Sequence, residues 1–199
     1  MLHIVDDEEV IRDSLTWLAS SRDIACTSYA DGAAFLSQFS APSTRPIFSE
    51  DGDCLLLDVR MPDLSGAALF DELANRGLTA RLPVIFLTGH GDVPMAVDSL
   101  KRGAFDFFEK PFNDNKLMDR VLEALSASRA AGSFAAVHQR LGALSARERE
   151  VLELILEGNM NKVIADKLGI SMRTVEVHRA HIFDKMHVKT AVELARLLK

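Results

Sequence analysis

Five polar side chains directly follow, or end, short apolar runs, and their types would suit one divalent cation and one phosphoryl group. In chain order they are Asp6 and Asp7 after residues 2–5, Asp58 after 54–57, Thr88 after 83–87, and Lys110 after 105–109. Short apolar runs are typical of buried strands. Because the carboxyl ends of parallel strands form the ligand-binding edge of an open sheet, we expect these side chains to meet at one edge.

The carboxylates predict a phosphoacceptor and a cation site. A carboxylate can attack phosphorus and carry the phosphoryl group as an acyl phosphate, and Asp58, alone at the end of the most apolar run, is our candidate. Mg²⁺ or Mn²⁺ would bridge the negative charges, held by oxygen atoms. We assign this cation to the carboxylates of Asp6, Asp7 and Asp58 and to the backbone carbonyl of Arg60.

Three further residues are predicted to bind the phosphoryl oxygens. Thr88 offers a hydroxyl, Lys110 an ammonium, and Gly89 a backbone N–H that no side chain obstructs. The Lys110 ammonium could instead pair with Asp58. Each residue alone carries little information, and an Asp pair after a strand is commonly just an acidic helix start. Their joint occurrence at four strand ends is what indicates a site.

The pattern around these residues predicts an α/β domain. Apolar runs at 2–6, 24–29, 53–58, 83–88 and 105–109 alternate with segments of helical spacing, as in a doubly wound parallel sheet. Residues 40–53, with two prolines and three acids, predict a long loop to which we assign no function.

Charge divides the 199 residues into two parts. Residues 1–138 hold 12 Lys and Arg against 21 Asp and Glu, a balance of −9, whereas residues 139–199 hold 11 against 8, a balance of +3. We expect a first domain over 1–125, a linker or helical extension over 126–142, and a second domain over 143–199. The two cysteines lack metal-ligand spacing, and no apolar stretch reaches membrane-spanning length, so a reduced, cytoplasmic, soluble protein is expected.

The second domain is predicted to be a bundle of four short helices. Capping boxes, Ser145 with Glu148 and Thr190 with Glu193, begin the first and last of them. Between these, a helix over 161–168, a turn at Gly169 and a helix over 171–186 have helix-turn-helix dimensions.

The outer face of the helix over 171–186 predicts contact with double-stranded DNA. An exposed Val177 among polar groups suits a thymine methyl in the major groove, and basic side chains here would meet phosphates. The predicted DNA-contacting residues are Lys162, Arg173, Thr174, Glu176, Val177, His178, Arg179, Ala180 and Lys185, with a structural or phosphate role for His178.

The motifs of residues 1–125 resemble those of response-regulator receiver domains. The matching segments are Val5 to Glu8, Leu57 to Pro62, Leu87 to Gly89 and Glu109 to Phe112. The resemblance implies a flavodoxin-like (βα)5 fold, phosphorylated on Asp58 by a partner sensor histidine kinase with Mg²⁺. It also implies that Thr88 and Phe107 form a coupled switch pair, although Phe107 stands where the family often has Tyr.

Residues 140–199 resemble the LuxR/FixJ-type helix-turn-helix domain, on the segments Leu144 to Leu152, Asn161 to Ala165, Thr174 to Arg179 and Lys185 to Met186. The resemblance implies a recognition helix over 171–186 and a transcription regulator of the FixJ/NarL kind. Its partners would be promoter DNA, a second copy of the chain after phosphorylation, and RNA polymerase.

Two rival functions are weighed against this reading. A haloacid-dehalogenase-like phosphatase also uses a strand-terminal Asp, but that chemistry needs a second Asp two residues later, where this chain has Arg60. We therefore expect no enzymatic turnover beyond slow self-dephosphorylation. A DNA-binding regulator with a receiver that does not switch is the second rival, and the complete set of polar residues argues against it.

Overall fold

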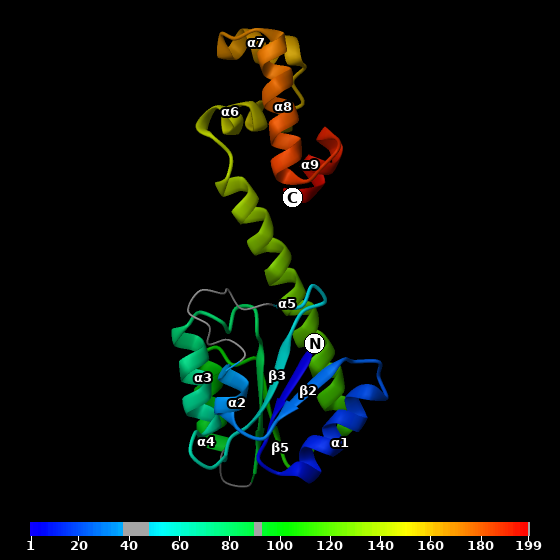
Figure 1. Ribbon diagram of the computed structural model, residues 1–199, viewed down its shortest axis with the longest axis vertical. Helices are drawn as coiled ribbons and strands as arrows, with labels where there is room; N and C mark the ends of the chain where they lie inside the picture. Colours follow the sequence, from blue (N-terminus) through cyan, green and yellow to red (C-terminus); the bar gives the residue numbers. More distant parts are fainter. Residues whose placement is uncertain (38–47, 90–92, 199) are drawn as a thin grey trace. The chain divides into compact units, whose positions relative to one another are not determined.

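The first part of the chain folds around a parallel sheet of five strands in the order β2-β1-β3-β4-β5 (Figure 1). This computed structural model describes residues 1–37, 48–89 and 93–198, and for 93–96 the backbone alone. The strands are β1 Leu2–Val5, β2 Cys26–Tyr29, β3 Cys54–Asp58, β4 Val84–Thr88 and β5 Asp106–Glu109. β1 begins where its apolar run was predicted to begin, the other four strands begin one or two residues later than theirs, and the predicted parallel α/β fold is confirmed.

The register of the sheet brings the carboxyl ends of its central strands together. Asp58 lies opposite Leu87, one residue before Thr88, and Thr88 lies opposite Glu109, one residue before Lys110. Val5 at the end of β1 lies opposite Leu57. The polar residues that end or follow these strands therefore share one edge, as expected from strands that all run in the same direction.

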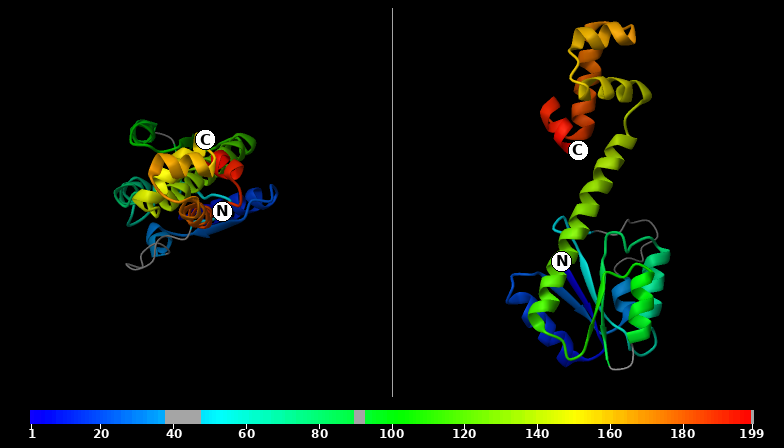
Figure 2. Two further views of the ribbon diagram at one scale, coloured as in Figure 1. Left: turned by 90° about the horizontal axis from the view of Figure 1, so that it is seen from above. Right: turned by 180° about the vertical axis from the view of Figure 1, so that it is seen from behind.

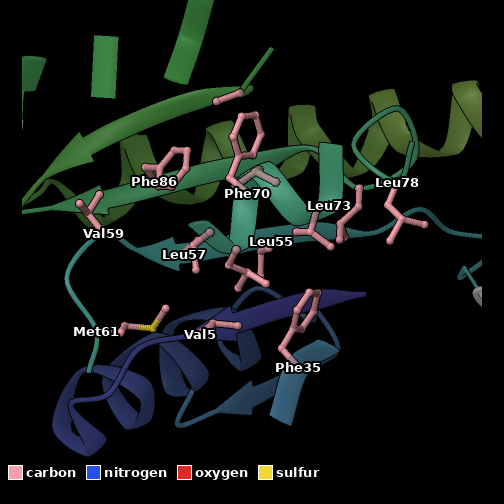
Figure 3. Packing of buried hydrophobic residues seen from close by; sticks show 14 residues of the cluster. Val5, Phe35, Leu55, Leu57, Val59, Met61, Phe70, Leu73, Leu78 and Phe86 are labelled. Carbon is pink, nitrogen blue, oxygen red and sulfur yellow. The ribbon is translucent and has the colours of Figure 1, made fainter. Parts of the chain in front are cut away.

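Helices cover both faces of the sheet (Figures 1 and 2). They are α1 Glu9–Ser20, α2 Gly32–Ser37, α3 Gly66–Asn75, α4 Val93–Lys101 and α5 Asp114–Gly142. One buried cluster packs α2 and α3 against Val5, Leu55, Leu57 and Phe86, as Figure 3 shows, and a second packs α1 and α5 against the opposite face. Burial on both faces explains why the runs of β3 and β4 are continuously apolar rather than alternating.

The chain divides into two compact units, residues 1–132 and 133–199. Residues 126–142, where the sequence allowed either a linker or a helix, are part of the 29-residue α5. The Ser128 hydroxyl is buried, accepts a hydrogen bond from Asp53 N at 2.8 Å and donates one to the Arg81 carbonyl at 2.5 Å. A Cβ on Gly132 would lie 2.6 Å from the Arg81 guanidinium, so this glycine permits close side-chain approach instead of ending the helix.

The second unit holds the predicted short helices, α6 Ala146–Leu156, α7 Asn161–Leu168, α8 Met172–Met186 and α9 Ala191–Leu197. They surround a core that includes Val151, Ile164, Val175, Ile182 and Leu194. The capping box at Ser145 and Glu148 is confirmed. At α9 the prediction is half wrong: Thr190 accepts the Glu193 N–H, but the Glu193 carboxylate accepts the N–H of Lys189 instead of the N–H of Thr190.

Two remaining expectations concern the loop and the membrane. Residues 40–47 of the predicted loop lie outside the described residues, and the remainder ends in a turn that leads into β3. Among the helices that the structure describes, none is long and apolar enough to cross a membrane.

Candidate phosphoryl site and nucleic-acid interface

A lysine bridges two carboxylates at the carboxyl edge of the sheet. Lys110 Nζ lies 2.7 Å from Asp58 Oδ1 and 2.8 Å from Asp6 Oδ2, although 52 and 104 residues of sequence separate the partners. Asp6 is fully buried, Asp58 is 6% exposed, and the Lys110 side chain retains 20% exposure. One positive charge thus faces two buried negative charges, which leaves this group with a net charge of −1.

Backbone N–H groups hold the second oxygen of each carboxylate. Glu8 N donates to Asp6 Oδ1 at 2.9 Å, and Arg60 N donates to Asp58 Oδ2 at 2.7 Å. Both donors lie two residues after their acceptor, which is the local turn that Asp side chains favour after a strand. The carboxylates are therefore oriented by the same loops that carry them.

The surroundings of Asp58 shift two pKa values. Burial raises the pKa of Asp58 above its ordinary value, and the hydrogen bond and charge of Lys110 reduce that rise without cancelling it, while nearby Asp6 adds to it. Burial of the Lys110 ammonium opposes its charge, but hydrogen bonds to Asp58 and Asp6 prevail and raise its pKa. Lys110 is thus held in its charged form beside Asp58, an acid whose ionised form is disfavoured by burial.

The donor set suits a hard divalent cation. Carboxylate oxygens with a net negative charge are the ligands that Mg²⁺ prefers. Asp7 is exposed beside Asp6, and Arg12 Nη1 donates to both backbone carbonyls, of Asp6 and Asp7, at 2.9 Å. Within the described ranges, no three His, Cys, Asp or Glu side chains are grouped to hold a metal ion as they stand. Arg12, which steadies this turn, carried no signal in the sequence.

Thr88 and Lys110 are joined through the backbone. Lys110 N donates to the Thr88 carbonyl at 2.7 Å, and the buried Thr88 hydroxyl donates to the Gly89 carbonyl at 3.1 Å. A Cβ built on Gly89 would meet nothing within 4 Å, so the space beside it is open. Phe107 lies opposite Phe86 in the sheet and packs, partly buried, against the core cluster of Figure 3.

Gly66 brings the loop after β3 against the phosphoacceptor strand. Its N–H donates to the Val59 carbonyl at 3.0 Å, and a Cβ at this position would lie 2.1 Å from the Asp58 carbonyl oxygen. Only glycine fits such an approach. Ser65 then caps α3 by accepting the Ala68 N–H, so the loop closes back on Asp58 before the helix begins.

In the second unit, α7, a left-handed turn at Gly169 and α8 form the helix-turn-helix. Gly169 has φ 65°, and Ser171 caps α8 by accepting the Thr174 N–H at 3.1 Å. Val175, Ile182 and Met186 are buried, whereas the opposite face is exposed, with Val177 at 48%. The predicted contact residues with exposed side chains are Lys162, Arg173, Glu176, Val177 and Ala180.

The other four residues predicted to contact DNA are partly buried or bonded to other residues of the second unit. The Thr174 hydroxyl pairs with the Ser171 hydroxyl at 2.8 Å, and the Arg179 guanidinium lies 5.3 Å from the Phe183 ring centre. His178 is half-buried, and its Nδ1 is buried without a hydrogen-bond partner in the described structure. Lys185 forms an ion pair with Glu148 at 2.7 Å.

Both halves of the chain match known protein families. Residues 2–122 match the family described as "Response regulator receiver domain", and residues 142–198 match "Bacterial regulatory proteins, luxR family".

Several relatives are similar along nearly the whole chain. The C4-dicarboxylate transport transcriptional regulatory protein DctR of Rhodobacter capsulatus is 51% identical, covering 98% of both chains. The transcriptional regulatory protein FixJ of Azorhizobium caulinodans is 43% identical, covering 98% of this chain and 90% of the relative. Among solved structures, the response regulator StyR is 33% identical with a TM-score of 0.68 over 99% of this chain and 96% of StyR. Full-length FixJ from B. japonicum is 39% identical with a TM-score of 0.57, covering 98% of this chain and 94% of FixJ.

Proposed function

The chain belongs to the response regulators that join a receiver domain to a LuxR-type DNA-binding domain, and on that premise we propose that phosphorylation of Asp58 by a partner sensor histidine kinase controls its binding to promoter DNA. The observation that carries the proposal is the Lys110 ammonium, 2.7 Å from Asp58 and 2.8 Å from Asp6. The ammonium stabilises the ionised form of Asp58, which is the nucleophile. After transfer, it is near enough to pair with the oxygens of the phosphoryl group on Asp58.

The proposed step is a transfer between two covalent carriers. Asp58 attacks the phosphorus of a phosphohistidine on the kinase, the new O–P bond forms, and the N–P bond breaks. The electron pair of the broken bond stays on the imidazole, which leaves as the free side chain. No oxidant or reductant is needed, and the acyl phosphate is later hydrolysed to restore Asp58.

A divalent cation belongs to the same proposal. Asp6, Asp7 and Asp58 would hold Mg²⁺ through their carboxylates and Arg60 through its carbonyl. When bound, Mg²⁺ would neutralise charge on the phosphoryl oxygens. Lys110 supplies a positive charge beside Asp58, and Thr88 and the Gly89 N–H complete the phosphate contacts.

The output follows from a shift between two states. We expect the Thr88 hydroxyl to leave the Gly89 carbonyl for a phosphoryl oxygen, and the Phe107 ring to move with it. A surface altered in this way favours a dimer, and two helix-turn-helix units then bind DNA together. The shift is limited by how much better the phosphoryl group fits one state than the other.

The first test is intact-mass spectrometry of the full chain after incubation with a small acyl phosphate, with and without Mg²⁺. Wild type is compared with Asp58→Asn and with Asp13→Asn, which changes an exposed acid on α1. One phosphoryl adduct in wild type and Asp13→Asn, dependent on Mg²⁺ and missing from Asp58→Asn, supports the proposal. A folded wild type without any adduct would favour the regulator whose receiver does not switch.

The second test measures DNA binding and mass in solution on the same samples. We expect phosphorylated wild type to dimerise in light scattering and to bind duplexes selected from a random pool more tightly than the unphosphorylated protein. Equal binding by phosphorylated and unphosphorylated protein would contradict the proposed control while leaving the DNA-binding activity itself in place.

A further inference from the structure

The first turn of α6 contains a buried carboxylate whose contacts exceed the needs of a helix cap. Glu148 is 4% exposed, and its Oε2 accepts the Ser145 N–H at 2.7 Å. In return, the Ser145 hydroxyl accepts the Glu148 N–H at 3.2 Å. A capping box needs only this exchange, which Gln provides as well as Glu.

The same carboxylate also connects α6 to the recognition helix. Glu148 Oε2 accepts a hydrogen bond from Lys185 Nζ at 2.7 Å, and Lys185 also donates to the Ala143 carbonyl at 3.3 Å. His181, one turn earlier on α8, has its Nδ1 3.8 Å from Glu148 Oε1. The last turns of α8 are therefore attached to the start of α6 across 37 residues of sequence.

The hydrogen bonds from Lys185 and from the Ser145 N–H, in that order, hold the pKa of Glu148 at about 2. The carboxylate is consequently ionised and paired throughout the neutral range. The corresponding acid of α9, Glu193, is exposed and bonds only within its own turn among the contacts that the structure describes. The link between two helices is thus a feature of Glu148 and not of helix caps in this domain.

An ion pair of this kind affects the orientation of the helix more than the stability of the domain. Apolar contacts such as those of Val175, Ile182 and Met186 place α8 against the core, but the hydrophobic driving force behind them has no preferred direction. A charge-assisted hydrogen bond of 2.7 Å is directional. Replacing a buried ion pair by neutral side chains is often nearly neutral for stability, whereas removing one partner is costly.

We propose that Glu148 and Lys185 are positioning residues for DNA reading: their ion pair sets the angle and register of α8 so that Glu176 and Val177 reach base edges while Arg173 meets a phosphate. This inference rests on the proposed DNA-binding function and changes the role expected for Lys185. Recognition sites tolerate displacements of only about 0.5 Å or 10–20°. A helix that has lost this link would still meet the phosphates but would discriminate less between sequences.

The test compares four full-length variants with wild type: Glu148→Gln, Lys185→Met, the double variant, and Glu193→Gln as a matched change at another helix start. Glu148→Gln keeps the capping acceptor and removes only the charge. Dissociation constants are measured by fluorescence anisotropy for a duplex that wild type selects from a random pool and for a random duplex, over a range of salt concentrations. Unfolding is followed by circular dichroism.

We expect the ratio of the two dissociation constants to fall about tenfold in Glu148→Gln and in the double variant, about 1.4 kcal/mol of discrimination. Binding to random DNA and its salt dependence should stay as in wild type, and Glu193→Gln should keep the full ratio. The double variant should regain most of the stability that Lys185→Met loses, without regaining discrimination.

Three results would overturn the inference, each in a recognisable way. A uniform loss of affinity in Lys185→Met, with the salt slope reduced by about one, would make Lys185 a phosphate contact. Discrimination that returns with stability in the double variant would reduce the pair to a structural role. A wild type that selects no sequence at all would remove the proposed function, and the positioning role with it.

Discussion

Lys110→Met should destabilise the first unit, because it removes the cation shared by Asp6 and Asp58. Removing one partner of a buried ion pair costs about 3–5 kcal/mol. Two features reduce this here: the Lys110 side chain is 20% exposed, and each carboxylate keeps one backbone N–H donor. We therefore expect a loss of about 2–3 kcal/mol in the free energy of unfolding at pH 7. For a unit of this size that corresponds to a Tm lower by about 6–12 °C.

The same reasoning predicts how the variant responds to Mg²⁺. A ligand that binds only the folded state raises its stability by RT ln(1 + [L]/Kd), where [L] is the free ligand concentration. Without the ammonium, the two buried carboxylates repel each other. Bound Mg²⁺ should therefore offset more electrostatic repulsion in Lys110→Met than in wild type. Millimolar Mg²⁺ should accordingly raise the Tm of the variant by more than it raises that of wild type.

The assay is thermal unfolding of the full chain by circular dichroism, with and without Mg²⁺. Hydrogen exchange of peptides from β1 and β3 assigns the transition to the first unit. Lys116→Met, a change at an exposed lysine on α5, is the control and should leave the Tm unchanged. If Lys110→Met unfolded within about 2 °C of wild type in the absence of Mg²⁺, the buried carboxylates would not depend on this ammonium, and our account of the site would be wrong.

Three further perturbations follow from single contacts. Gly66→Ala should cost about 1–3 kcal/mol and slow phosphorylation of Asp58, measured as the rate of adduct formation, because the new Cβ would displace the Asp58 carbonyl. Ser128→Ala should cost about 2 kcal/mol or more in urea denaturation, because Asp53 N–H and the carbonyl bonded to Ser128 lose their buried partner. Because the pKa of Glu148 is lowered from its ordinary value of 4.5 to about 2, its ionised form stabilises the fold fully above pH 4.5, and this stabilisation is lost as the pH falls toward about 2. The free energy of unfolding of the second unit should therefore fall less steeply over this pH range in Glu148→Gln than in wild type.

Much of this protein is determined by local sequence alone. The apolar runs, each short and separated by helical spacing, are sufficient to specify parallel strands, since no hairpin turn joins them. Chain direction then places Asp6, Asp58, Thr88 and Lys110 at one edge, because every strand of a parallel sheet ends on the same side. The helix-turn-helix was equally predictable, since caps at Ser145 and Ser171 are local signals.

Other features depend on contacts between distant segments. The sequence allowed a break in residues 126–142, because Gly132 disfavours a helix, yet α5 continues to Gly142, and Ser128 anchors it to Asp53 and Arg81, which are distant in sequence. Lys110 was expected to pair with the phosphoryl oxygens or with Asp58, and the contact with Asp58 is present, whereas its simultaneous contact with Asp6 depends on the register between strands.

Lys185 illustrates the same limit most clearly. From the sequence, Lys185 is one more cation beside a DNA-reading face, and the capping box is a sufficient reason for Glu148 to be present. Only the packing of α8 against α6 brings the partly exposed Lys185 ammonium to 2.7 Å from the buried Glu148 carboxylate. Residue type and spacing thus determine which groups are present and on which element, whereas the pairing of buried charges is decided by tertiary structure, because a buried charge must find its partner wherever the fold places one.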